Sequence, residues 1–241
     1  MVARRFPLSR TQVLPGSKKS SLKMDKLHNF LASVTGQEKV GFIDYSQTSL
    51  YVAAAAIAFN PIFWNIVARQ EYRTHFLTKI FGSPYYGCYA LALTIFGLGI
   101  FRDSLYKTAL EEQPLYPPLL QPTLGVLLFC TGNVLVLSSM WALGITGTYL
   151  GDYFGILMDE KVEGFPFNVT GAPMYWGSTL SFLGTALYKG RAAGVLLTLE
   201  VFVMYYIALK YEDPFTADIY AKKEARPVTR SMTKQKDGKK A

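Results

Sequence analysis

The residues best suited to chemistry in this chain lie between Gly144 and Ser178, a stretch rich in glycine, aromatic rings and carboxylates such as Asp152. Glycine lets the backbone approach a ligand closely, and an aromatic ring with a polar tip sits well at a membrane boundary. These residue types suit a site at a membrane surface for a cationic, partly apolar ligand, although packing at that boundary uses many of them too. The aromatic members are Tyr149, Tyr153, Phe154, Phe165, Phe167, Tyr175 and Trp176.

A second acidic group, Glu212 and Asp213, lies shortly after the last apolar block. A carboxylate near an apolar site can bind a cation or accept a proton from an amine. We therefore take Asp152 and Glu212 as candidate catalytic residues. Two plainer interpretations stand beside this one: Asp152 is an ordinary solvated boundary residue, and Asp213 before Pro214 opens a helix as its N-cap.

Metal and disulfide chemistry have little support in the sequence. His28 and His75 stand alone, and no Cys or His pair has the spacing of metal ligands. The two cysteines, Cys88 and Cys130, both fall inside apolar blocks, where a free thiol packs as a small hydrophobe. The sequence therefore predicts no metal site and no disulfide framework.

The elements that must position these groups are membrane helices. Half of the 241 residues are hydrophobic, only 17% are charged, and the apolar residues collect in blocks. Several blocks approach the ~20 residues that a helix needs to cross the hydrocarbon core. The sequence therefore predicts an all-α fold, a polytopic helical integral membrane protein with three to five membrane-embedded helices. The blocks are Leu50–Val67, Tyr85–Phe101, Leu119–Gly147 and Ala192–Leu209.

Two places in this pattern leave alternatives open. Asn60-Pro61 interrupts the first block, which is then either a kinked span or a re-entrant element. The segment Arg102–Pro118 is expected to be a polar connection, because it is rich in charge.

The last two apolar arms, Pro173–Tyr188 and Ala192–Leu209, are separated by only Lys189-Gly190-Arg191. Three residues with a central glycine form a tight turn between antiparallel helices, so we expect a helical hairpin. Its open ends would bring Tyr175 and Glu212 side by side on one membrane face.

Basic residues concentrate in two tails, at residues 1–43 and 221–241, around a membrane-embedded domain at residues 44–220. The tails read as disordered and account for most of the net charge of +8. We expect them to contact anionic lipid headgroups rather than nucleic acid. Two basic tails favour a cytosolic location for both and four crossings, whereas a re-entrant first block would move the N-terminus to the lumen.

Several strings in the chain resemble the phospholipid N-methyltransferases, integral membrane enzymes that use S-adenosylmethionine. The resemblance covers the chain from about Asp44 to Tyr220, and it is greatest to the short fungal members of the family. It implies methylation of phosphatidyl-N-methylethanolamine and phosphatidyl-N,N-dimethylethanolamine to phosphatidylcholine, without a metal. The strings are NPIFWNIVAR (60–69), VLVLSSMWALGITGTYLGDYFGIL (134–157), FPFN (165–168), PMYWGST (173–179) and YEDPFTADIY (211–220).

The family's two cofactor motifs fall on identifiable residues of this sequence. A Gly-x-Gly motif falls on Cys130-Thr131-Gly132, where a cysteine replaces the first glycine, and an acidic pair falls on Glu212 and Asp213. The resemblance implies that these residues bind S-adenosylmethionine. Ring faces of aromatic residues can also stabilise a sulfonium or an ammonium group by cation–π contact. The substrate-binding candidates are Tyr149, Tyr153 and Tyr175.

The resemblance also implies a phospholipid substrate in the bilayer and a multi-pass protein of the endoplasmic reticulum membrane. The basic, acid-poor first residues keep a mitochondrial membrane as a second location. Alternative functions are methylation from phosphatidylethanolamine through all three steps, a small transporter, or a non-catalytic membrane scaffold. The sequence leaves the oligomeric state unknown.

Overall fold

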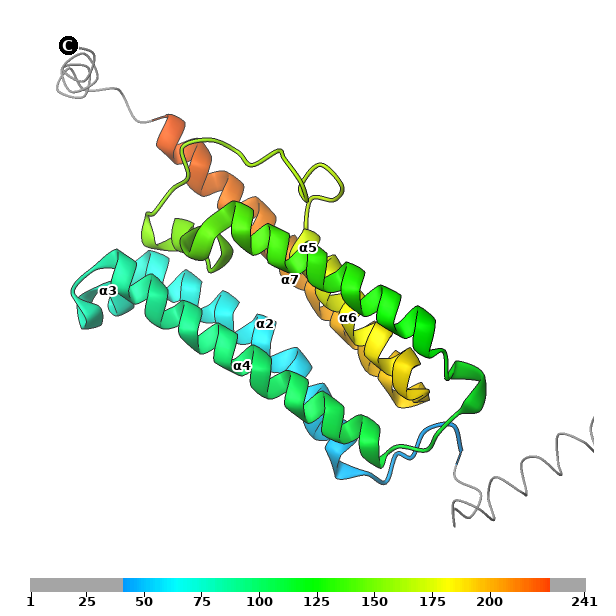
Figure 1. The fold of residues 1–241 in the computed structure, drawn as a ribbon. Coiled ribbons are helices and arrows are strands. Elements are labelled where there is room, and N and C mark those ends of the chain that lie inside the picture. The colour runs from blue at the N-terminus through cyan, green and yellow to red at the C-terminus, as the bar shows by residue number, and fades with distance from the viewer. Residues whose placement is uncertain (1–40, 226–241) are drawn as a thin grey trace, which may run out of the picture. The chain divides into compact units, whose positions relative to one another are not determined.

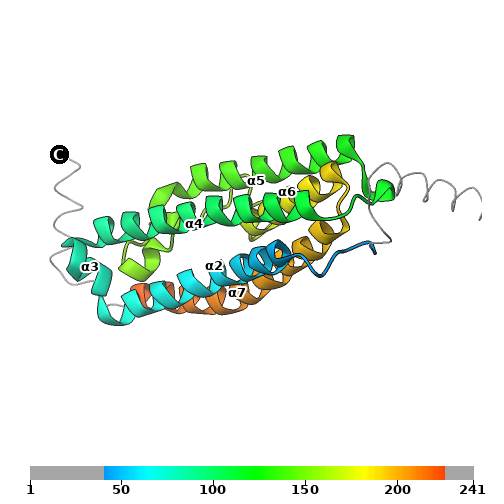
Figure 2. The same ribbon diagram turned by 90° about the horizontal axis from the view of Figure 1, so that it is seen from below.

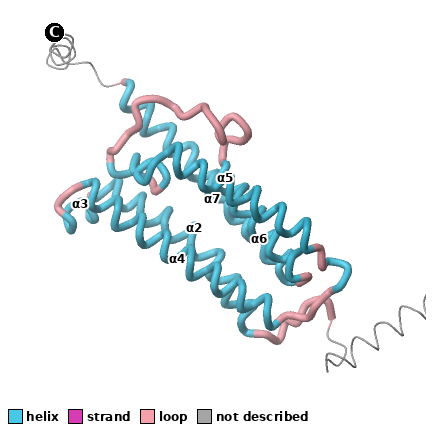
Figure 3. The backbone as a smooth tube through the Cα atoms, viewed as in Figure 1, coloured by secondary structure: helices cyan, strands magenta, loops and turns pink. Residues whose placement is uncertain are grey.

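The computed structural model describes residues 41–225, so most of the tails predicted over residues 1–43 and 221–241 lie outside it. From Phe42 onward the described part consists of helices joined by loops, with no strand (Figure 3). This confirms the predicted all-α class. The elements are α2 (Thr48–Thr74), α3 (Phe76–Phe81), α4 (Pro84–Glu112), η1 (Pro117–Leu119), α5 (Pro122–Thr148), η2 (Gly151–Phe154), α6 (Pro173–Lys189) and α7 (Ala192–Glu224).

Five of these helices form the legs of one bundle, α2, α4, α5, α6 and α7 (Figure 1). Within the described residues, four elements are long and apolar enough to cross a membrane: α2, α4, α5 continued through η2, and α7. The fifth leg, α6, has 17 residues, one fewer than the 18 required of a candidate span. The predicted polytopic helical membrane protein is therefore confirmed. In Figure 2, α5 lies beside α6 and α2 lies beside α7.

Helix α2 runs without interruption through Pro61 and is long and apolar enough to cross a membrane, which favours the spanning alternative for the first block. Proline removes a single helical donor, and packing of the neighbouring turns holds the rest of the helix. The helix ends at His75, whose φ of 53° turns the chain into α3. The buried carboxylate of Glu71 accepts hydrogen bonds from the Leu77 N–H (2.7 Å) and the Thr78 hydroxyl, which satisfies free donors at the start of α3.

Helix α4 continues to Glu112, so the polar connection predicted from Arg102 is wrong in its first part. Charge was the reason for that prediction, yet the Arg102 side chain is only 11% exposed. Its guanidinium donates hydrogen bonds to the Tyr205 hydroxyl (2.7 Å) and to the Asp103 carboxylate (2.8 Å). Because the charge is paired and hydrogen-bonded, it can lie inside an apolar helix.

The predicted hairpin of α6 and α7 is present, with Gly190 at a φ of 62° in the turn between them. The buried Tyr106 hydroxyl of α4 donates to the Phe182 carbonyl of α6 (2.9 Å) and also lies 3.2 Å from the Gly194 carbonyl of α7. This side chain therefore ties three legs together at the closed end of the hairpin.

Helices α5 and α6 approach each other at two glycine pairs. A Cβ atom on Gly125 would lie 2.7 Å from the Gly184 carbonyl oxygen, and a Cβ atom on Gly177 would lie 2.5 Å from the Gly132 carbonyl oxygen. Any larger residue at these positions would force the helices apart. Small residues that allow this close approach are typical of membrane helix interfaces.

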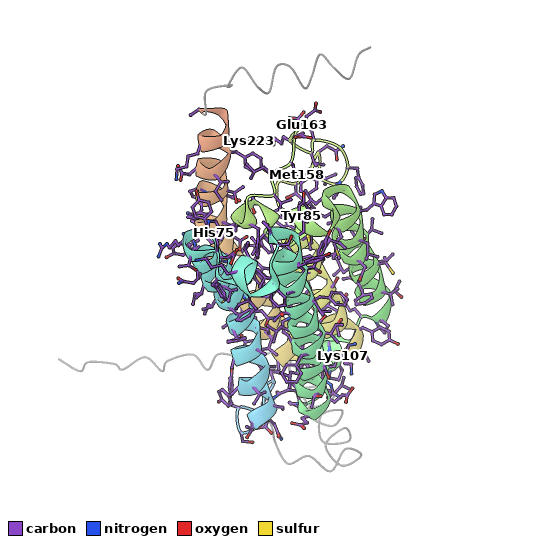
Figure 4. The ribbon with its side chains drawn as sticks, turned by 90° about the vertical axis from the view of Figure 1, so that its left-hand side faces the viewer. His75, Tyr85, Lys107, Met158, Glu163 and Lys223 are labelled. Atoms are coloured by element: carbon purple, nitrogen blue, oxygen red, sulfur yellow. The ribbon has the colours of Figure 1, made fainter. Side chains whose placement is uncertain are left out.

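The two ends of the bundle carry different parts of the chain. At one end, the Phe42 and Tyr116 rings contact each other (centroids 4.7 Å apart), and Arg191 donates to the Gln113 carbonyl. Figure 4 shows Met158 and Lys223 at the opposite end. An odd number of legs thus separates the first described residues from the last. The tails themselves lie almost entirely outside the described residues, so the expectation that both face the cytosol stays a prediction.

Candidate active site

A cavity of about 1210 Å³ opens at the end of the bundle that carries Lys223. Every leg of the bundle contributes to its wall, and the loop after η2 adds further residues. Pockets of several hundred Å³ with a few polar groups in an apolar wall are typical of small-molecule sites. The ionisable residues that line it are Asp152, Asp159, Glu160, Lys161, Glu212, Asp213 and Lys223, together with Tyr149, Tyr175 and Tyr220.

Glu212 of α7 is the most enclosed carboxylate of this cavity, with only 9% of the residue exposed. Its Oε1 atom accepts hydrogen bonds from Trp64 Nε1 (2.7 Å) and from Asn65 Nδ2 (2.7 Å). Its Oε2 atom accepts a hydrogen bond from the Tyr175 hydroxyl. The contact between Tyr175 and Glu212 confirms that the open ends of the hairpin lie side by side.

All three donors to Glu212 are electrically neutral. Among the described residues, no lysine, arginine or histidine forms an ion pair with this carboxylate. Placing a charge away from water is costly unless a charge of opposite sign compensates it. An ionised Glu212 would therefore be stabilised by a positively charged ligand in the cavity.

Asp152 reaches the same cavity from η2. Its Oδ2 atom accepts a hydrogen bond from the Thr216 hydroxyl of α7 (2.8 Å), so η2 and α7 are held together at the site. The structure thus brings Asp152, Glu212 and Asp213 to one cavity, although 60 residues separate Asp152 from Glu212 in the sequence. Asp213 is exposed, unlike its neighbour.

Two of the three predicted tyrosines border the cavity, Tyr149 and Tyr175. The Tyr175 ring also stacks on Tyr205, with centroids 4.7 Å apart, which fixes the direction of its hydroxyl. Tyr153 is different: it is 1% exposed, stacks on Phe215 at 4.9 Å and does not border the cavity. Its position in the core gives it a packing role.

The predicted cofactor motif Cys130-Thr131-Gly132 lies elsewhere, on the middle part of α5. None of its three residues borders the cavity, and both Cys130 and Thr131 are exposed on the outside of the bundle. Gly132 faces α6, where an added Cβ atom would lie 2.9 Å from the Ser181 nitrogen. The structure therefore places the motif at a helix–helix contact.

Sequence reasoning missed Trp64 and Asn65, the residues of α2 that donate to Glu212. An asparagine inside an apolar block is a signal that could have found them, because a polar side chain in a membrane helix needs a partner. The loop after η2 covers the mouth of the cavity through two contacts of Met158. Its N–H donates to the Tyr220 hydroxyl (3.1 Å), and its carbonyl accepts from Lys223 Nζ (3.1 Å).

Comparison with known proteins shows which family the chain resembles. The family described as phospholipid methyltransferase matches residues 120–223, a stretch that contains α5, α6 and almost all of α7. It therefore includes Asp152, Tyr175 and Glu212 but not Trp64 and Asn65. No solved structure matches the chain.

Curated relatives match the chain over most of their length. Phosphatidyl-N-methylethanolamine N-methyltransferase of Emericella nidulans is 72% identical over 183 residues, which cover 76% of this chain and 91% of that protein. The Saccharomyces cerevisiae protein of the same name is 58% identical over 78% of this chain and 93% of its own length. Phosphatidylethanolamine N-methyltransferase of Rattus norvegicus is 48% identical over 80% and 98%, respectively.

Proposed function

Because the chain belongs to the phospholipid methyltransferase family, we propose that it methylates phosphatidyl-N-methylethanolamine and phosphatidyl-N,N-dimethylethanolamine to phosphatidylcholine. The observation that carries the proposal is the buried Glu212 carboxylate, which has neutral donors and no basic partner among the described residues. Both ligands of such an enzyme carry positive charge, the methyl donor on sulfur and the lipid on its amine. The cavity offers the compensating charge inside a multi-pass membrane protein.

The family implies S-adenosylmethionine as the donor, which supplies a methyl group attached to a positively charged sulfur. The residues present fit such a molecule, since the cavity of about 1210 Å³ combines an apolar wall with Glu212 and Asp213. These two carboxylates would hold its cationic groups. The predicted contribution of Cys130-Thr131-Gly132 to binding of the donor stays a prediction.

The lipid amine must lose its proton before its lone pair can react. An alkyl amine of this kind titrates near 10, so the neutral form costs about 4 kcal/mol at pH 7. Apolar surroundings favour the neutral amine, and a carboxylate in reach can accept the proton. We assign this role to Asp152: the N–H bond breaks, an O–H bond forms on the carboxylate, and the proton leaves through the mouth of the cavity.

The aromatic residues support the charged product. A quaternary ammonium group has no proton to donate, so it cannot hydrogen-bond and is recognised mainly by the faces of aromatic rings. Tyr149 and Tyr175 border the cavity, and each ring can contribute about 0.5–2 kcal/mol to such a contact. Glu212 provides the balancing charge.

The proposal is tested by measuring initial rates of methyl transfer to three lipids in one detergent preparation, from labelled S-adenosylmethionine. The lipids are phosphatidylethanolamine and its monomethyl and dimethyl derivatives. We expect fast transfer to the two methylated lipids and slow transfer to phosphatidylethanolamine. Equal rates on all three would replace the narrower assignment by a three-step enzyme, and no transfer to any of them would overturn the proposal.

We place the enzyme in the endoplasmic reticulum membrane, with a mitochondrial membrane as the second location. The four candidate spans support a multi-pass protein, and the basic tails support contact with anionic headgroups. Fractionation of cells that express the tagged chain, with methyl transfer measured in each fraction, tests the location. Activity confined to another membrane would contradict it.

A further inference from the structure

Two hydroxyls in the wall of the cavity have no partner within the described residues, that of Thr148 at the end of α5 and that of Ser139 deeper along the helix. Ser139 of α5 is fully buried and borders the cavity, and its Oγ atom forms no hydrogen bond within the part of the chain that the structure describes. A serine in a helix commonly donates to the carbonyl four residues before it. The neighbouring Ser138 does so, with its Oγ atom 2.6 Å from the Val134 carbonyl. An unsatisfied buried hydroxyl is uncommon in proteins and calls for a ligand or a specific cause.

The position of Ser139 relates it to the membrane. It lies five residues before Gly144, where α5 kinks (φ 65°, ψ −177°), and nine residues before the end of α5, so it is farther from the mouth of the cavity than Gly147 and Thr148, which also line it. Ile95 lies at a comparable depth, 11 residues after the start of α4. Ile95, Leu143 and Leu209 border the cavity with Ser139, and we call these four residues the deep arm. Asp152 in η2 and Asp213, one turn after Leu209 on α7, border the cavity nearer to the loop that covers its mouth.

The separation of an acidic mouth from an apolar deep arm matches the chemistry of the lipid rather than that of its water-soluble co-substrate. A diacyl phospholipid carries its ester carbonyls between a polar headgroup and apolar chains. An ester carbonyl only accepts hydrogen bonds, and the deep arm offers it one O–H donor among apolar side chains. A headgroup held near Asp152 and Glu212 directs the glycerol esters toward the membrane interior, where the deep arm lies.

On the basis of the proposed function, we infer that the deep arm binds the glycerol ester region of the phospholipid substrate, with the Ser139 hydroxyl donating to an ester carbonyl. This makes the enzyme selective for ester-linked over ether-linked lipids. An ether oxygen is a much weaker acceptor, and it leaves the Ser139 hydroxyl unsatisfied in the complex. The selectivity appears mainly in KM, because the contact is the same before and during methyl transfer.

The test compares phosphatidyl-N,N-dimethylethanolamine with its dialkyl ether analogue of equal chain length, in mixed micelles. We expect the unmodified enzyme to prefer the diester lipid by roughly three- to tenfold in kcat/KM, the range of one neutral hydrogen bond. Ser139→Ala should abolish this preference by raising KM for the diester lipid alone. Ser139→Thr, which keeps a hydroxyl, should retain it. Ser138→Ala is the matched control and should leave it unchanged.

Every other pattern overturns the inference. No preference in the unmodified enzyme would show that the esters are not recognised. A preference that survives Ser139→Ala would place the recognition elsewhere. An equal loss on both lipids in Ser139→Ala would show that the hydroxyl serves packing or an ordered water. Failure of the proposed function is distinct from all of these, because the unmodified enzyme would then methylate neither lipid.

Discussion

Replacing Glu212 by glutamine removes the buried charge while the surrounding contacts can be kept. Trp64 and Asn65 both donate to the same carboxylate oxygen, so a glutamine with its amide oxygen in that place still serves both donors. Its amide nitrogen then faces the Tyr175 hydroxyl, which can rotate and accept. We therefore expect Glu212→Gln to insert into the membrane and accumulate like the unmodified protein.

The effect on ligand binding follows from electrostatics. A cation about 4 Å from a carboxylate is attracted by about 4 kcal/mol at the effective dielectric constant of about 20 that is typical of protein sites. A loss of that size corresponds to about a thousandfold in kcat/KM. Stability should change in the opposite direction: without a ligand the buried charge is uncompensated, so the variant should melt at the same or a higher temperature.

The assay is transfer of a labelled methyl group to phosphatidyl-N,N-dimethylethanolamine over a range of S-adenosylmethionine concentrations, with a melting curve of the same preparation. Asp213→Asn is the comparison variant, because Asp213 borders the same cavity but is exposed, so that its charge is screened by solvent. We expect a smaller effect for this variant, less than a tenfold loss. An unchanged Michaelis constant for S-adenosylmethionine with normal turnover in Glu212→Gln would refute the reasoning.

Three further predictions concern other parts of the site. Asp152→Asn should lower the maximal rate while the KM for S-adenosylmethionine stays nearly constant, and a normal maximal rate would remove its role as the base. Gly132→Leu should lower the melting temperature by overpacking α5 against α6, whereas Cys130→Gly should be tolerated; a normal melting temperature with weakened donor binding would instead support the cofactor motif. The site should open to the cytosol, because the water-soluble methyl donor is made there. A cysteine placed at Glu163 should therefore react with an impermeant reagent from the cytosolic side of sealed microsomes, and labelling only after the vesicles are opened would contradict this location.

The sequence was sufficient to predict the helices and the hairpin because these depend on local signals. Apolar blocks of nearly spanning length define the legs, and Gly190 between two such blocks marks the turn. The prediction that the hairpin joins Tyr175 to Glu212 followed from the same two signals and is confirmed by their hydrogen bond. Arg102 was misassigned because its partner Tyr205 is 103 residues away, and local charge alone indicates a loop.

The site could be predicted in part for a similar reason. Asp152 and Glu212 stand out as carboxylates at the edges of apolar blocks, so their types and positions mark them. Tyr153 has the same local character as Tyr149, yet only Tyr149 borders the cavity. The difference is the direction of each side chain after the end of α5, which depends on packing against Phe215 of α7. Such a distant contact leaves no mark in the nearby sequence.

The cavity joins a polar mouth to an apolar deep arm, so the rate of methyl transfer depends on two substrates that arrive from different phases. The co-substrate arrives from the aqueous phase and obeys an ordinary molar concentration. The lipid arrives from the bilayer, where its supply is set by the number of molecules per unit area of membrane. We expect the rate per enzyme molecule to saturate with the mole fraction of methylated lipid in the vesicle that contains it. This rate should stay constant when the vesicle suspension is diluted at a fixed co-substrate concentration. A cell could thus change the output of this enzyme by altering the composition of the surrounding membrane, with the amount of enzyme and of co-substrate held constant.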